Sequence, residues 1–117
     1  MTIINLTPHS IDIINDADVR IVSIPSSGVA RADTDKTPAA PVIVAGVEIP
    51  VVVVEFGAPI DLPDPADGVQ LIVSTITAQS AAQAGRTTAD LLTPDGAPVR
   101  DADGQILGVR ALARVAS

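Results

Sequence analysis

Arginine carries most of the ligand-binding potential of this chain, because Lys36 is the single lysine among seven basic residues. A planar guanidinium can bind a phosphate or a carboxylate through two parallel hydrogen bonds. We therefore expect a pocket for a small anionic ligand, lined by four arginines and three helping side chains: Arg31, Arg86, Arg110 and Arg114 with His9, Ser26 and Ser74. In the alternative interpretation, the arginines form exposed ion pairs that each contribute about 0 to 1 kcal/mol.

The pattern of residues near the C-terminus predicts that two of these arginines lie on the same face of a strand. Residues 105–115 are predicted to form one strand, and side chains alternate between the two faces of a strand. Arg110, Leu112 and Arg114 would then share one face, and Val109 with alternate residues to 115 would share the other. We expect the arginine face to be the binding surface.

Ser74 is placed for either capping or anion binding. Residues 76–84 predict a short helix that Ser74 or Thr75 would cap and Gly85 would end. A helix N-terminus favours negative charge, but capping explains the serine without a ligand. The chain has no G-x-x-x-x-G-K-[ST] and no G-x-G-x-x-G motif, which excludes the standard nucleotide-binding folds.

Catalysis and metal binding have weaker support. His9 is the only imidazole, and no G-x-S-x-G motif brings a serine beside it. The aspartate pairs at 16 and 18 and at 101 and 103 supply two carboxylates each, whereas calcium takes about six to eight oxygen ligands. We expect no catalytic set, no metal and no cofactor; a hydrolase that uses His9 is a third possibility.

Composition limits the class of protein and its partners. A chain of 117 residues predicts a single domain over residues 1–117. The net charge of −7 disfavours duplex nucleic acid. No apolar stretch is long enough to cross a membrane, cysteine is absent and no leader sequence is recognised. We expect a cytosolic protein with a core of small aliphatic side chains, joined by Phe56.

Hairpin signals dominate the chain. Three apolar runs are each followed by a turn and a second β-prone run: 11–14 with 19–24, 42–44 with 47–54, and 99–100 with 105–115. Residues 69–73 predict a buried strand, Pro50 predicts a sheet edge or a bulge, and residues 93–96 predict a turn. Small and polar residues over 32–41 predict a mobile loop. The fold class is α+β, mostly antiparallel β in a sheet or small barrel, with one short helix.

Five segments together resemble a group of small phage and prophage proteins of about this size. They are residues 4–9, which contain the Asn-Leu-Thr-Pro-His motif, 24–31, 71–74, 99–101 and 104–110. The resemblance runs along nearly the whole chain and implies a bacteriophage or prophage accessory protein in the cytoplasm of a bacterial host. It carries over no functional residue. The chain is also similar, in size and in its arginine-dominated basic residues, to the anti-Thoeris sponges, which bind nucleotide immune signals without cleaving them.

Two functions from different classes follow. We expect an anti-defence protein, not an enzyme, that sequesters a small anionic, nucleotide-derived signal. The alternative is a structural, assembly or protein-interaction module whose exposed β edge at residues 47–54 pairs with another chain, because an unpaired edge strand is a template for strand addition. In both cases we expect a homo-oligomer.

Overall fold

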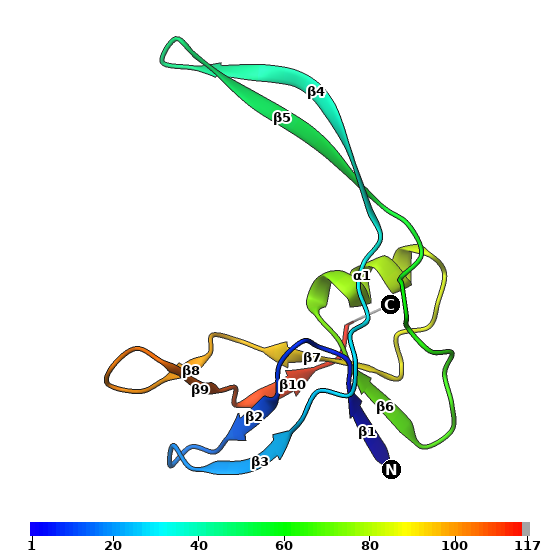
Figure 1. The fold of residues 1–117 in the computed structure, drawn as a ribbon, viewed down its shortest axis with the longest axis vertical. Coiled ribbons are helices and arrows are strands. Elements are labelled where there is room, and N and C mark those ends of the chain that lie inside the picture. Colours follow the sequence, from blue (N-terminus) through cyan, green and yellow to red (C-terminus); the bar gives the residue numbers. More distant parts are fainter. Residues whose placement is uncertain (116–117) are drawn as a thin grey trace.

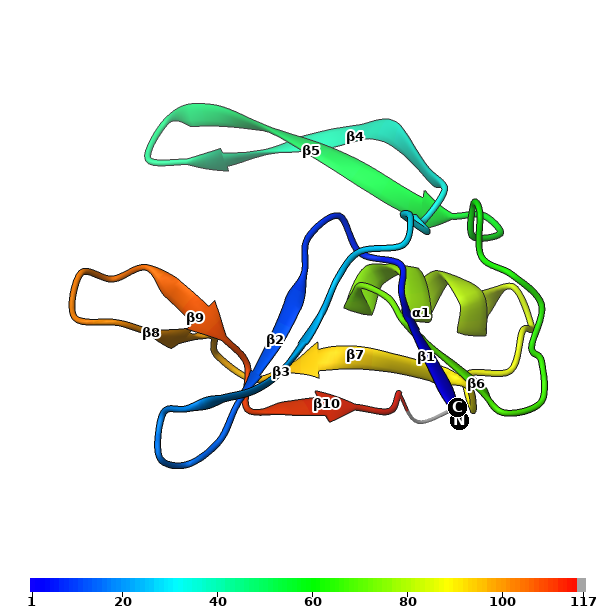
Figure 2. The same cartoon turned by 60° about the horizontal axis from the view of Figure 1, so that its bottom comes forward.

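The computed structural model of the protein describes residues 1–115, which form a small body with three two-stranded ribbons (Figures 1 and 2). In chain order the elements are β1 (Thr2–Asn5), β2 (Ile11–Ile14), β3 (Arg20–Ile24), β4 (Thr34–Val44), β5 (Val47–Phe56), β6 (Val69–Ile72), α1 (Thr75–Gln83), β7 (Leu91–Asp95), β8 (Val99–Arg100), β9 (Ile106–Gly108) and β10 (Ala111–Ala113). The radius of gyration is 17.4 Å, whereas a compact domain of this length has about 13 Å. The ribbons account for this extended shape.

The body is built on a four-stranded sheet in the order β1-β6-β7-β10. Strands β1, β6 and β7 run parallel, and β10 is antiparallel to β7. The parallel pairs β1–β6 and β6–β7 were not among the predicted antiparallel hairpins. Strands β6 and β7 run parallel because α1 connects them and returns the chain to the end of the sheet where β6 began. Among residues 1–115 the strands form this open sheet and three separate ribbons, and no closed barrel is present.

Helix α1 covers one face of the sheet and completes a small core. The predicted helix is confirmed: Ser74 accepts a hydrogen bond from the N–H of Thr77 at 3.2 Å, and Gly85 follows the helix with a φ of +84°. The core consists of aliphatic side chains from the sheet, the helix and two adjoining loops: Leu6, Ala30, Leu71, Val73, Ala78, Ala81 and Leu91. Small helix residues let α1 lie close to the strands.

Asn5 is fully buried and organises the loop after β1. Its Nδ2 donates to the carbonyl of His9 at 2.8 Å and to the carbonyl of Ile24 at 2.9 Å. Its Oδ1 accepts from the N–H of Thr7 at 2.9 Å and from the hydroxyl of Thr7 at 2.6 Å. Ser26 Oγ then donates to the carbonyl of Thr7 at 2.6 Å. The Asn-Leu-Thr-Pro-His motif thus fastens the β2–β3 ribbon to the sheet.

The β8–β9 ribbon lies against β2. The N–H of Val109 donates to the carbonyl of Asp12 at 2.9 Å, and the N–H of Ile14 donates to the carbonyl of Val109 at 2.8 Å. A Cβ on Gly108 would lie 2.3 Å from the Asp12 carbonyl oxygen, so only glycine fits here. This contact divides the single strand predicted over residues 105–115: β9 pairs with β8, and β10 pairs with β7 instead.

Strands β4 and β5 form the longest ribbon, which we call the arm (residues 34–56). The arm stands clear of the body in both views (Figures 1 and 2). Its tip is the predicted two-residue turn, with φ of +50° at Ala45 and +79° at Gly46. Ala40 and Pro41 together oppose Pro50, which forms the bulge that Pro50 predicts.

The mobile loop predicted over residues 32–41 is wrong, because β4 begins at Thr34. Small and polar residues in this segment carry little β-propensity of their own. Four consecutive residues of the segment pair with valines of β5: Lys36 with Val54, Thr37 with Val53, Pro38 with Val52 and Ala39 with Val51. Cross-strand pairing therefore decides the conformation here, in place of local propensity.

Helix α1 also holds the root of the arm. The hydroxyl of Ser80 donates to the carbonyl of Gly57 at 2.7 Å, and the hydroxyl of Thr77 donates to the carbonyl of Ala30 at 3.4 Å. The N–H of Gly57 donates to the carbonyl of Asp33 at 2.8 Å. Because Ser80 and Thr77 are buried, these contacts fix where both arm strands leave the body.

The turn predicted at residues 93–96 lies mostly within β7, which extends to Asp95. The carbonyl of Leu92 accepts from the N–H of Val73, so the polar groups of Leu92 and Pro94 face β6. Strand β6 ends at Ile72. The missing N–H of Pro94 therefore costs no sheet hydrogen bond, and proline is tolerated in this strand.

Replacing Asn5 by alanine should lower the free energy of unfolding by roughly 2 to 5 kcal/mol, because it leaves several buried backbone groups without partners. The measurement is urea unfolding followed by circular dichroism. Asn15→Ala is the control, since Asn15 Oδ1 accepts from Ala17 and Val19 in an exposed turn, and its cost should stay below about 1 kcal/mol. Equal costs for the two variants would contradict a central role for Asn5.

Candidate functional site

Two of the seven predicted ligand-binding residues line one pocket. Arg31 and Ser74 border a hollow of about 360 Å³ between the loop after β1, the segment before β4 and the start of α1. The other lining residues are Leu6, Thr7, Pro8, Val29, Ala30, Ala32, Thr34, Ile76 and Thr77. The pocket thus combines an exposed guanidinium and a helix N-terminus with mostly aliphatic walls.

His9 and Ser26 lie in segments next to this pocket, in structural roles. Ser26 Oγ donates to the carbonyl of Thr7, and the carbonyl of His9 accepts from Asn5. His9 itself is exposed. Ser74 caps α1 through Thr77, as the capping interpretation predicts. The polar groups around the pocket therefore have internal partners, while Arg31 is exposed.

Arg86 is engaged in the body and does not reach the pocket. Its guanidinium makes a two-pronged ion pair with Asp90, both distances being 2.9 Å. It also donates to the carbonyls of Thr87 and Pro63 at 2.7 Å. The side chains of Arg86 and Asp90 are only 14% and 10% exposed. This arginine cross-links the loop after α1 to the loop before β6.

Arg110 and Arg114 flank β10 and point to different parts of the molecule. Arg110 donates to the carbonyl of Asn15 and pairs with Asp18 at 2.6 Å, which ties it to the β2–β3 turn. Arg114 donates to the carbonyl of Ala89 on the opposite side of the body. The structure therefore does not gather the predicted arginines around one hollow: only Arg31 remains at the pocket.

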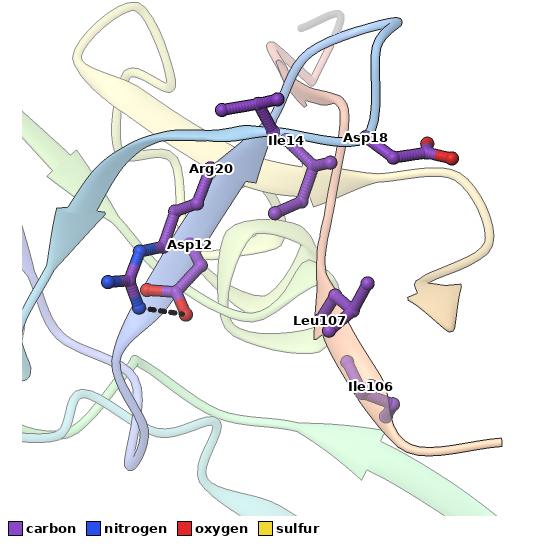
Figure 3. Close-up of a pocket in the computed structure, with 7 residues that line it drawn as sticks. Asp12, Ile14, Asp18, Arg20, Ile106 and Leu107 are labelled. Atoms are coloured by element: carbon purple, nitrogen blue, oxygen red, sulfur yellow. Dashed lines mark ion pairs between the residues drawn. The ribbon is translucent and has the colours of Figure 1, made fainter. Parts of the chain in front are cut away.

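A second cleft, which sequence reasoning missed, lies between the β2–β3 and β8–β9 ribbons (Figure 3). It measures about 480 Å³ and is lined by Asp12, Ile14, Asp18, Val19, Arg20, Ile106 and Leu107. Arg20 and Asp12 form a loose ion pair at 3.8 Å within it. The cleft forms because Gly108 lies against the backbone of Asp12. No local sequence pattern predicts this contact, because the two residues are far apart in the chain.

Acidic residues gather at the root of the arm. Asp33, Asp35 and Glu55 line a hollow of about 310 Å³ with Phe56 and Gly57. Phe56, expected in the core, is only partly buried here. Across residues 1–115, no three side chains that could ligate a metal come together. Asp101, one of the turn aspartates, accepts from the N–H groups of Asp103 and Gln105 and so serves its hairpin.

The arm presents the largest set of exposed aliphatic side chains. Residues paired across an antiparallel ribbon lie on the same face, so the register divides the arm into two faces. One face, which we call the valine face, consists of Thr37, Ala39, Val42, Val44, Val47, Ile49, Val51 and Val53, and it continues at the root with the pair Asp35 and Glu55. The opposite face carries Lys36, Glu48 and the prolines at 38 and 50 among its aliphatic residues.

Within the valine face, five side chains are between 41% and 62% exposed: Val42, Val44, Val47, Ile49 and Val53. A two-stranded ribbon has no second layer to cover them. The alternation of valines over residues 47–53 next to a two-residue turn is the sequence signal for this face. Its full length could not be found, because β4 was expected to be a loop.

No protein family, curated protein or solved structure matches this chain. In the part of the chain that the structure describes, no helix has the length and apolar character needed to cross a bilayer.

Breaking the Arg86–Asp90 pair tests whether Arg86 is a structural residue. Arg86→Ala should lower the free energy of unfolding by about 3 to 5 kcal/mol, because it strands a buried carboxylate. Arg114→Ala, which removes an exposed hydrogen bond, should cost less than about 1 kcal/mol. Urea unfolding of both variants provides the measurement, and an Arg86→Ala protein as stable as the parent would refute this role.

Proposed function

We propose that this protein is a non-enzymatic assembly or protein-interaction module, and that its arm is the surface that joins it to another protein chain. The observation that carries the proposal is the valine face, a row of exposed aliphatic side chains on a ribbon that stands away from the body. Contiguous exposed apolar surface of this kind is typical of interaction sites.

The energetics support association through the arm. Full burial of one aliphatic side chain contributes about 1.5 to 3 kcal/mol. The five exposed aliphatic side chains of the valine face, four valines and Ile49, are about half exposed, so covering each of them contributes on the order of 1 kcal/mol. The sum for two partners is comparable with the cost of association, which is about 4 to 15 kcal/mol. Such an interface is of modest affinity.

The anchorage of the arm supports the same proposal. The hydroxyls of Ser80 and Thr77 hold its root from the buried face of α1. A ribbon fixed in this way presents the valine face in a constant direction, which lowers the ordering cost of binding. The resemblance to phage and prophage proteins supports the further proposal that the module acts in the cytoplasm of a bacterial host.

A photo-crosslinking amino acid placed at Val42 tests the arm as an interface. We expect it to couple the protein covalently to a defined protein chain, identified by mass spectrometry, when the protein is expressed in bacteria. The same amino acid at Gln79, exposed on α1, serves as the control and should yield no such product. Absence of any specific adduct from Val42 would contradict the proposed function.

A second candidate function is sequestration of a small anionic, nucleotide-derived ligand, without cleavage, in the pocket beside α1. The specific observation that favours it is the shared hollow of Arg31 and Ser74, since both were expected to bind such a ligand. A helix N-terminus and a guanidinium act together on a phosphate. This candidate ranks second because Arg86, Arg110 and Arg114 hold contacts elsewhere.

Thermal unfolding in the presence of cyclic ADP-ribose isomers and cyclic oligonucleotides tests the second candidate. A bound ligand in large excess should raise the unfolding temperature by several degrees, because it stabilises only the folded chain. Arg31→Glu should abolish the shift, whereas Arg114→Glu, a matched charge reversal outside the pocket, should retain it. A protein whose unfolding temperature responds to none of these ligands contradicts sequestration.

A further inference from the structure

The cleft between the β2–β3 and β8–β9 ribbons contains two neighbouring side chains of opposite charge, Asp12 and Arg20 (Figure 3). Asp12 Oδ1 is buried and has no hydrogen-bond partner among residues 1–115. The other carboxylate oxygen, Oδ2, lies 3.8 Å from Nη1 of Arg20, which is too long for a hydrogen bond. The carboxylate and the guanidinium therefore leave each other's hydrogen-bonding groups free.

A purely structural ion pair does not explain this arrangement. Charge-assisted hydrogen bonds between such groups form at about 2.7 to 2.9 Å, and the pair of Arg86 and Asp90 meets that distance at 2.9 Å. A buried carboxylate oxygen without a donor is unfavourable, and nearly all buried polar atoms in proteins have partners. Asp12 is better explained by a donor that comes from outside the chain.

The walls of the cleft are fixed by contacts between the ribbons. The N–H of Val109 donates to the carbonyl of Asp12 at 2.9 Å, and the N–H of Ile14 donates to the carbonyl of Val109 at 2.8 Å. Asp18, which also lines the cleft, is paired with Arg110 at 2.6 Å. A site that is ordered before binding loses less entropy when a ligand enters.

Aliphatic side chains form much of the remaining surface of the cleft. Ile14 pairs with Arg20 across the ribbon and lies two residues from Asp12, so all three share the face that lines the cleft. Ile106 and Leu107 of β9 lie on the facing wall and are exposed (Figure 3). Apolar walls with a few polar groups are typical of small-molecule sites of about 300 to 1,000 Å³. The volume of this cleft, about 480 Å³, falls in that range.

We propose that this cleft binds a free aliphatic amino acid. The ammonium group donates to Asp12 Oδ1, the carboxylate accepts two hydrogen bonds from the guanidinium of Arg20, and the side chain packs against Leu107. An amine alone would leave Arg20 without a partner, and a carboxylate alone would leave Asp12 without one. A ligand that carries both charges close together satisfies both residues. The site is separate from the arm, so this proposal is independent of the proposed function.

Titration of the full chain with L-leucine, L-isoleucine and L-valine tests the proposal, followed by nuclear magnetic resonance of the methyl groups of Ile106 and Leu107. We expect saturable shifts of these signals and none for Leu71 in the core. Isoamylamine and 4-methylpentanoate are matched to leucine but each lacks one of its two charged groups. Their dissociation constants should be more than about tenfold higher, because each loses a charge-assisted hydrogen bond.

Asp12→Asn should raise the dissociation constant for leucine by more than about tenfold, because it removes the negative charge opposite the ammonium group. Asp16→Asn is the control, since Asp16 is an exposed residue of the β2–β3 turn outside the cleft, and it should leave the constant unchanged. Circular dichroism establishes that the variants are folded. Arg20→Gln, at an exposed position, replaces Asp12→Asn if that variant is not.

Three outcomes would overturn the proposal: no saturable shift with any of the three amino acids, equal binding of the amine or the carboxylate alone, or an unchanged dissociation constant in the folded cleft variant. None of them bears on the arm, which the photo-crosslinker at Val42 tests separately.

Discussion

A two-stranded ribbon cannot bury its own apolar face, and this constraint decides which apolar side chains of the chain are buried and which are exposed. The body solves the problem locally, because α1 covers the sheet and the small side chains of Ala78 and Ala81 complete the core. The arm has no such cover, and Val44 and Val47 at its tip are 55% and 62% exposed. The apolar residues of the chain are thus divided between an internal core and an external strip on the arm, which we propose is covered by a partner chain.

Polar contacts within the body fix the position of the arm. Buried Asn5 fastens the loop after β1 to the end of β3, and Ser80 fastens α1 to the carbonyl of Gly57 at the root of the arm. Arg86 and Asp90 lock the loop after α1 in the same unit. These polar contacts replace the large aromatic anchors that the composition does not supply. The Asn-Leu-Thr-Pro-His motif is therefore, in this chain, a structural element that holds the body together.

Sequence reasoning identified elements whose signals are local and missed those that depend on distant partners. The turn at Ala45 and Gly46 and the helix capped by Ser74 follow from backbone preferences, and both are confirmed. Strand β4 was not predicted over residues 34–41, because its pairing with β5 overrides the weak β-propensity of these residues. The arginine site was expected because arginines favour anions, but a guanidinium also satisfies carbonyls at close range. Arg86 and Asp90 lie beyond the end of α1, where the four-residue spacing that favours ion pairs on a helix does not apply. The partners of Arg110 lie far away in the chain.

The most direct measurement of the central claim is the relaxation of methyl groups by a soluble paramagnetic probe, recorded by nuclear magnetic resonance on a dilute solution of the folded chain. The account predicts strong relaxation of the methyl groups of Val42, Val44, Val47 and Val53 on the arm, and little relaxation of those of Leu71 in the core. Arm methyl groups as protected from the probe as those of Leu71 would contradict it.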